Sequence, residues 1–257
     1  MPRLALISSL LVLVLGLACE SGPPAPAQVR IAHLVPDAPA VDVCLKPDSV
    51  AAFGSPFVGG TGLSYPSLSE RTAVDAGTYS ARLVAGGSTS CATSLNGLGD
   101  VTGLALGEGA TQTLALTGRL SGTGTPALAV KQYDDRTAAT PSGGVSLRAV
   151  NAAPGSSAQD VGVVSGSLFQ SFASGVSFGS ASAYQTISIT PGATNVSAAL
   201  AARDSSSQAV WAVGNFSNVS DTGVYTLYVI GVPGQTATQR PSLLLCSDTA
   251  LSCAQSP

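Results

Sequence analysis

The feature that most constrains the fold of this chain is an internal repeat. Residues 30–36 align without a gap with residues 148–154, and at the same offset residues 40–43 fall on residues 158–161. Arg, Pro, Ala, Asp and Val recur in register between the two stretches. Self-similarity at a fixed spacing is typical of a chain built from copies of one structural unit. We therefore predict two copies of one domain.

The correspondence continues along the chain with small changes of offset. The further matching stretches are 62–65 with 175–178, 75–77 with 190–192, 113–118 with 226–231, and 126–128 with 241–243. Because order and spacing are both kept, chance similarity is a poor explanation. The boundary between the copies is expected in the polar, turn-prone residues 136–144.

Within each copy the hydrophobic periodicity is that of strands. Apolar and polar residues alternate in 79–83 and again in 186–190, which places alternate side chains on one face of a sheet. The 29 Gly and 16 Pro favour many turns, and only 10% of residues are charged against about 25% in a typical protein. We predict an all-β chain with two tandem β-sandwich domains of the immunoglobulin-like or Greek-key type. Residues 195–203 could pass for a helix by their Ala content, but their place in the repeat favours a strand.

The amino terminus reads as an export signal. Arg3 supplies a positive charge, residues 4–17 form an apolar run too short for a permanent transmembrane helix, and Ala18-Cys19 marks a processing point. The sequence Gly16-Leu17-Ala18-Cys19 resembles the lipobox of bacterial lipoproteins, in which this Cys is acylated. The alternative is an ordinary secretory signal that is cleaved near Ala18 or a later Ala. Two or three acyl chains on Cys19 would anchor the chain stably to a membrane.

The sequence therefore predicts the following organisation. Residues 1–18 form a lipoprotein signal peptide, 19–28 a Pro-rich tether, 29–136 the first sandwich, 137–144 a linker and 145–257 the second sandwich. Glu20 follows the acylated Cys in place of the Asp that typically retains lipoproteins at the inner membrane. An outer-membrane location in the cell envelope is expected.

Four cysteines remain once Cys19 is set aside. An even number in an exported chain indicates two disulfides, for which three pairings are possible. We favour Cys44–Cys91 and Cys246–Cys253, because each pair then stays within one repeat. A zinc site is the alternative, but the chain has a single His and no C-x-x-C spacing. No metal or cofactor is predicted.

Residues 31–43, Ile-Ala-His-Leu-Val-Pro-Asp-Ala-Pro-Ala-Val-Asp-Val, resemble the opening strand of the DUF4397 domain. Residues 75–79 and 224–231 are similar to later landmarks of that family. The resemblance implies secreted or anchored bacterial surface proteins, often in tandem copies, and supplies no general activity. In the second copy Gly155-Ser156-Ser157 stands where the first has Asp37-Ala38-Pro39. A role of Asp37 therefore cannot be common to the two copies.

Two motifs could suggest catalysis. Residues 175–179 match G-x-S-x-G with Ser177 as the nucleophile, but no His follows to act as a base. Residues 62–66 occupy the same place in the first copy, so we interpret the motif as a landmark of the repeat. His33 is the only histidine, and its repeat partner is Asn151. A structural role is therefore predicted for His33, and no enzymatic activity for the chain.

For some of the other polar and aromatic residues, two roles are considered. For Asp42 and its repeat partner Asp160 we predict hydrogen bonds to turn amides; calcium binding by Asp37 and Asp42 is the alternative. Asp134-Asp135 is expected to form a solvated turn near the linker. Trp211, the sole tryptophan, fits a sandwich core better than a sugar-stacking face.

Charge limits the possible partners. The net charge is −3 and the 11 Lys and Arg are scattered, so no nucleic-acid partner is expected. The sequence favours a non-enzymatic, lipid-anchored envelope protein that serves adhesion, matrix contact or envelope assembly. Its partners would be the membrane, through acylated Cys19, and an envelope polysaccharide or protein. The alternative is a carbohydrate- or ligand-binding surface module.

Overall fold

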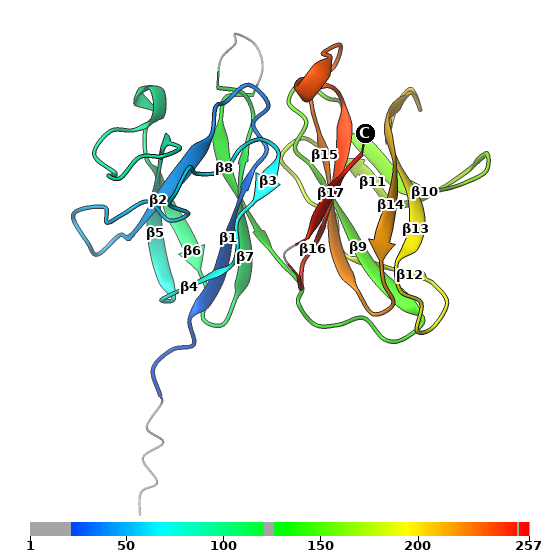
Figure 1. The fold of residues 1–257 in the computed structure, drawn as a ribbon, viewed down its shortest axis with the longest axis horizontal. Helices are drawn as coiled ribbons and strands as arrows, with labels where there is room; N and C mark the ends of the chain where they lie inside the picture. The colour runs from blue at the N-terminus through cyan, green and yellow to red at the C-terminus, as the bar shows by residue number, and fades with distance from the viewer. Residues whose placement is uncertain (1–21, 121–125, 251, 257) are drawn as a thin grey trace, which may run out of the picture.

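The computed structural model describes residues 22–120, 126–250 and 252–256, and within them the chain is all-β apart from two short 3-10 turns. The strands form two β-sandwiches that lie side by side (Figure 1). The predicted signal peptide and Cys19 lie outside the described residues. Within the described ranges no helix is long and apolar enough to cross a lipid bilayer.

The first sandwich has two sheets. One sheet contains β1 (Ala27–His33), β3 (Ser67–Leu68), β4 (Thr72–Val74), β7 (Thr111–Thr117) and β8 (Ala129–Asp134). The other contains β2 (Val41–Pro47), β5 (Gly77–Ala85) and β6 (Val101–Leu106), with the 3-10 turn η1 (Leu95–Gly97) between β5 and β6.

The second sandwich repeats this plan. One sheet contains β9 (Gly144–Asn151), β12 (Gln185–Ser188), β15 (Val224–Ile230), β16 (Ser242–Ser247) and β17 (Cys253–Gln255). The other contains β10 (Gln159–Ser165), β11 (Leu168–Val176), β13 (Val196–Asp204) and β14 (Val210–Val219), and η2 (Ala237–Gln239) lies between β15 and β16. Residues 196–203 thus belong to a strand and not to a helix, and Asn195 lies in the bend before it.

The two halves share most of their strand pairings, although among the described residues β10–β11 and β16–β17 occur only in the second. β1 runs parallel to β7, and β9 runs parallel to β15 in the same place. The antiparallel pairs β2–β5, β5–β6 and β7–β8 have their counterparts in β10–β13, β13–β14 and β15–β16. In each half the chain passes back and forth between its two sheets, which closes a sandwich around one core.

Each sandwich encloses a hydrophobic core of its own. In the first, Tyr79, Ala81 and Leu83 of β5 all point into the core, as their alternation predicted. In the second, Ile187 and Ile189 pack against the core from its edge. Burying alternate apolar side chains of two facing sheets is the main source of stability in such a fold.

Both predicted disulfides are present. Cys44 in β2 is bonded to Cys91, with a Cα–Cα distance of 6.0 Å. Cys246 in β16 is bonded to Cys253 in β17, with a Cα–Cα distance of 4.1 Å, and this bond ties the last strand to the sheet.

The two sandwiches pack through the outer faces of the β1 and β9 sheets, so that four sheets form successive layers (Figure 1). A third hydrophobic cluster fills this interface. Its buried members are Ala32, Leu34, Ala115 and Tyr133 from the first sandwich and Val150, Ala152, Tyr228, Ile230, Leu244 and Cys246 from the second.

Candidate functional site

The interface contains two arginines in equivalent positions. Arg30 lies on β1 and Arg148 on β9, and each is almost completely buried. The Nε of each donates a 2.8 Å hydrogen bond to a threonine hydroxyl of its own sheet, Thr113 for Arg30 and Thr226 for Arg148. This intramolecular bond orients each guanidinium toward the opposite sandwich.

Each arginine then reaches across the interface to an aspartate of the other sandwich. Arg30 Nη2 lies 2.5 Å from Asp248 Oδ1, and its Nη1 donates to the Ser247 carbonyl at 3.0 Å. Arg148 Nη2 pairs with Asp135 Oδ1, and its Nη1 donates to the Asp134 carbonyl at 2.6 Å. The two sets of contacts are reciprocal, so the interface has the pattern of a pseudo-twofold axis.

Additional donors satisfy the two carboxylates. Asp135 also accepts from the Thr113 hydroxyl and from Arg71 Nη2 at 2.8 Å. Asp248 accepts from the Thr226 and Tyr184 hydroxyls, each at 2.8 Å. Burial raises the pKa of Asp248, and Arg30 beside it opposes that shift.

Burial of these charges is nearly complete. The side chains of Arg30, Arg148, Asp135 and Asp248 are exposed by 3% or less. Two positive and two negative groups balance, which is the condition under which ionised side chains are tolerated away from water.

The prediction of a solvated turn at Asp134-Asp135 is therefore wrong for Asp135. The side chain of Asp135 points into the interface because Arg30, Arg71 and Arg148 converge on it. Sequence reasoning missed this network. The available signal was an arginine kept in both copies of a chain poor in charge.

One side of the interface is closed by direct contacts between the sandwiches. The Tyr133 hydroxyl on β8 donates to the Gly179 carbonyl at 3.0 Å, and the Lys131 side chain packs against Gly179. The Tyr184 hydroxyl accepts from the backbone N–H of Arg136 at 3.2 Å. These contacts fill the seam between β8 and the loop that precedes β12.

The equivalent seam on the other side is open. Lys131 pairs with Ala115 in its sheet, and Leu244 pairs with Tyr228 in the same place of the second sheet. By the same register Cys246 occupies the position of Tyr133. Because Leu244 and Cys246 are smaller than Lys131 and Tyr133, a groove remains.

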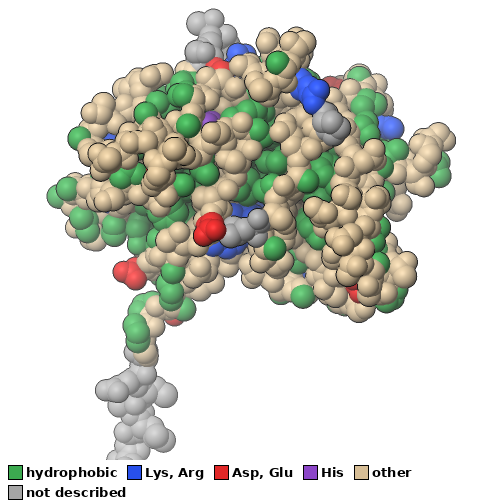
Figure 2. Space-filling view, in the orientation of Figure 1, with side chains coloured by type: hydrophobic (Ala, Val, Ile, Leu, Met, Phe, Trp, Pro, Cys, Tyr) green, Lys and Arg blue, Asp and Glu red, His purple; other side chains and the backbone are tan. Residues whose placement is uncertain are grey.

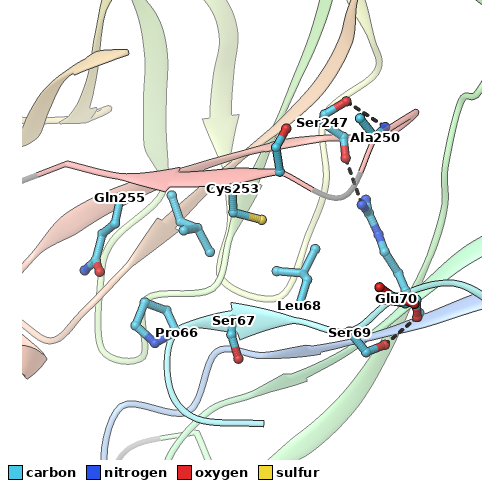
Figure 3. Close-up of a pocket in the computed structure, with 12 residues that line it drawn as sticks. Pro66, Ser67, Leu68, Ser69, Glu70, Ser247, Ala250, Cys253 and Gln255 are labelled. Atoms are coloured by element: carbon cyan, nitrogen blue, oxygen red, sulfur yellow. Dashed lines mark hydrogen bonds between the residues drawn. The ribbon is translucent and has the colours of Figure 1, made fainter. Parts of the chain in front are cut away.

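This interdomain groove has a volume of about 480 Å³ (Figure 3). Its lining residues are Arg30, Pro66, Ser67, Leu68, Ser69, Glu70, Leu244, Ser247, Ala250, Ser252, Cys253 and Gln255. Figure 3 shows β3 and β17 as its two walls, with Leu68 and Cys253 pointing toward one another between them. On the same face, hydrophobic side chains follow the seam, and acidic and basic groups gather beside it (Figure 2).

The predicted site aspartates have structural partners. Asp42 accepts from the backbone N–H groups of Val58 at 2.9 Å and Gly59 at 2.6 Å, which fixes the following loop as predicted. Asp160 accepts from Gly175 N–H at 2.8 Å in the same place of the second half. Among the described residues no group of three or more His, Cys, Asp or Glu could hold a metal ion.

His33 also has a structural role. Its Nε2 donates to the Pro39 carbonyl at 3.0 Å, and its Nδ1 accepts from the Val35 N–H at 3.3 Å. Asn151 makes the same pair of contacts, with the Ser157 carbonyl at 3.2 Å and the Ala153 N–H at 3.1 Å. Burial lowers the pKa of His33, so its ring is neutral at pH 7.

Neither Ser177 nor Trp211 forms a site. Ser177 follows β11 in a turn that leads toward β12, whereas a nucleophile elbow needs a turn from a strand into a helix. Trp211 packs against the second core, and its indole N–H donates to the Ile230 carbonyl at 3.4 Å.

The architecture and the interface define the class of the protein: an all-β chain of paired sandwiches joined by reciprocal buried ion pairs. Residues 27–162 match the model of a family described as "Domain of unknown function (DUF4397)", which covers more than half of the chain. The chain belongs to the DUF4397 family. The match spans the first sandwich and continues through β9 into β10.

Among solved structures, the chain is similar to a Bacteroides thetaiotaomicron protein of the DUF1812 family, described as a candidate polysaccharide-binding protein. The two are 8% identical, the TM-score is 0.22, and the alignment covers 87% of this chain and 96% of the other. Comparison with curated proteins finds no match.

Proposed function

We propose that this protein is a non-enzymatic, lipid-anchored envelope protein that presents its two sandwiches as one rigid body for adhesion, matrix contact or envelope assembly. The observation that carries the proposal is the reciprocal pairing of Arg30 with Asp248 and of Arg148 with Asp135. Separating the sandwiches would break both reciprocal pairs and expose the hydrophobic cluster between the sandwiches to water, which is unfavourable. The sandwiches therefore move together.

The described amino-terminal segment supports a tethered arrangement. Residues 22–26 leave the first sandwich at one end (Figure 1). Ala25 is held to the turn between β6 and β7, because its N–H donates to Glu108 Oε1 at 3.2 Å and its carbonyl accepts from Gly109 N–H at 3.0 Å. A lipid on Cys19 would thus be connected to the body through a short Pro-rich segment that is semi-rigid.

Residues 145–257 form a second domain of the same family in this proposal. The repeated strand pairings, and the recurrence of Arg, Thr and Asp at the interface, support a common origin of the two halves. The domain limits are those given by the sequence, 29–136 and 145–257, with residues 137–144 as the linker.

The proposed lipid anchor on Cys19 can be tested by metabolic labelling. A Gram-negative bacterial host that expresses the precursor is supplied with a palmitate analogue. We expect the wild type to take up label and to sediment with outer membranes, and Cys19→Ser to do neither. Ser21→Ala is the matched control and should behave as the wild type. Glu20→Asp should move the labelled protein to the inner membrane. Uptake of label by Cys19→Ser would show that the anchor assignment is wrong.

The second candidate function is a carbohydrate- or ligand-binding surface module. The observation that favours it is the interdomain groove, whose volume of about 480 Å³ falls within the range of small-molecule sites, about 300–1,000 Å³.

A further inference from the structure

We infer that the interdomain groove between β3 and β17 binds a neutral oligosaccharide. This inference rests on the second candidate function and names its site and its ligand class. The juxtaposition behind this inference is an aliphatic strip flanked by a free carboxylate on one wall and a partly free amide on the other.

The groove is a specific departure from the symmetry of the interface. The two seams have equivalent positions, and one of them is filled by Lys131 and Tyr133 against Gly179. At the other seam the equivalents are Leu244 and Cys246, and Cys246 is held by its disulfide to Cys253. β17 supplies one wall and has no counterpart among the described residues of the first sandwich. Both the smaller side chains and the additional strand therefore favour an open seam.

Part of the groove lining is aliphatic. Pro66, Leu68 and Leu244 contribute aliphatic groups to it, beside a larger number of polar residues. A pyranose ring has one face of C–H groups and a rim of hydroxyls. Contact of the C–H face with an aliphatic strip removes apolar surface from water, while the hydroxyls remain available to polar groups at the edges.

Polar groups at the two edges have free hydrogen-bonding capacity. The Glu70 carboxylate makes no hydrogen bond or ion pair with any of the described residues, so both of its oxygens can accept. Gln255 donates one N–H to Ser242 Oγ at 3.1 Å, which leaves its carbonyl oxygen and its second N–H. Sugar hydroxyls both donate and accept, and therefore fit a carboxylate on one wall and an amide on the other.

Charge decides between neutral and acidic ligands. Arg30 and Glu70 are the charged residues among those that line the groove. The Arg30 guanidinium is already bonded to Thr113, Ser247 and Asp248, so it is not available to a ligand. Among the lining residues, the charge that stays available to a ligand is the negative charge of Glu70, which repels phosphates and acidic sugars.

A peptide ligand fits the groove less well. An added strand needs a row of unpaired backbone groups along an edge. β3 has two residues and β17 has three, whereas typical strands have about 5–6. Side chains dominate the lining, which favours a ligand recognised by scattered hydrogen bonds.

The test uses the mature full-length chain. The chain is probed on an array of neutral and acidic oligosaccharides, and its affinity for the bound glycans is then measured by calorimetric titration. We expect binding to neutral oligosaccharides. Glu70→Ala and Gln255→Ala should each weaken it by about tenfold, the effect of losing one or two good hydrogen bonds. Glu70→Ala also installs the residue of the closed seam, since Ala183 is its repeat partner.

The matched control is Gln185→Ala, an exposed glutamine on β12 outside the groove, which should leave the affinity unchanged. Thermal unfolding of each variant verifies that the fold is intact. Preference for acidic glycans, equal binding by wild type and both groove variants, or binding of extended peptides without any glycan would each overturn the inference. Acyl labelling is independent of the groove, so a negative array result with normal labelling rejects the groove assignment and the carbohydrate-binding candidate but leaves the proposal of an anchored envelope protein standing.

Discussion

At the scale of single residues, one polar side chain braces the same corner in each sandwich. His33 and Asn151 each accept from the backbone N–H two residues later and donate to the carbonyl six residues later. A buried imidazole and a buried amide are thus equivalent here as long as the imidazole stays neutral. Their difference is that only the imidazole can take up a proton.

We expect His33→Asn to make the stability of the protein less dependent on pH. The pKa of His33 is lowered in the folded state by burial, so the unfolded chain takes up a proton first as the pH falls through about 6.5. The wild type should therefore lose free energy of unfolding between about pH 7 and pH 5, and the variant should lose less. At pH 7 the variant should lie within about 1 kcal/mol of the wild type.

Denaturant unfolding at a series of pH values measures this difference. Asn151→His is the reciprocal variant and should steepen the loss in the same pH range. A wild type and a His33→Asn variant with equal slopes would mean that His33 titrates alike in both states.

Some residue roles could be predicted from sequence and others could not. The hydrogen-bonding role of Asp42 could be predicted from its place after a turn. The structural role of His33 could be predicted from its pairing with Asn151 in the repeat. The partners of Asp135 could not be predicted, because they come from Arg30, Arg71 and Arg148 on three separate segments.

At the scale of elements, a glycine begins the same hairpin in each sandwich. Gly118 follows β7 and Gly231 follows β15, with φ of 95° and 92°. A Cβ on Gly231 would lie 2.1 Å from the Arg240 carbonyl oxygen, and one on Gly118 would lie 2.3 Å from that of Ala127. Each hairpin therefore requires a residue that has no side chain and tolerates positive φ.

We expect Gly231→Ala to lower the free energy of unfolding by about 3 kcal/mol, since it combines left-handed strain with a clash against backbone. Gly234→Ala is the control in the same hairpin. Gly234 also has a positive φ, 72°, but no atom lies within 4 Å of its Cβ position, so only about 1 kcal/mol is expected. Equal losses in chemical denaturation would show that the close approach has no effect.

The strands themselves were predictable, because the alternation of apolar and polar residues identifies a strand that buries one of its faces. The parallel pairing of β1 with β7 was not predictable, because residues far apart in sequence, such as Gln28 and Thr111, are paired only once the sandwich has closed. The groove was also beyond prediction. It depends on Cys246 standing where the first sandwich has Tyr133, and on which side chains meet across the interface.

At the scale of the whole molecule, the interface is a balanced set of buried charges surrounded by a hydrophobic cluster. Such a set contributes less to net stability than apolar packing of the same volume, but the loss of one member is expensive. It therefore specifies one relative orientation of the sandwiches.

We expect Asp135→Ala to destabilise the protein by about 3–5 kcal/mol, because three arginines lose a shared partner in a buried site. In calorimetry the wild type should unfold in one transition, and the variant should show a second as the sandwiches uncouple. Asp134→Ala changes the exposed neighbour, which loses its 2.7 Å hydrogen bond from Gln112 Nε2 while its backbone carbonyl still accepts from Arg148, and should cost only about 1 kcal/mol. Similar losses for the two variants would contradict the role of the network.

The position of β1 has a mechanical consequence. β1 is paired with β3 and β4 on one side and with β7 on the other, and its first residue continues directly into the amino-terminal segment. A force on that segment is directed along β1, so the ladders on both sides are loaded in shear and break together. Unzipping one bond at a time would need far less force. A chain pulled through its amino terminus is therefore held by a strand that is paired on both sides.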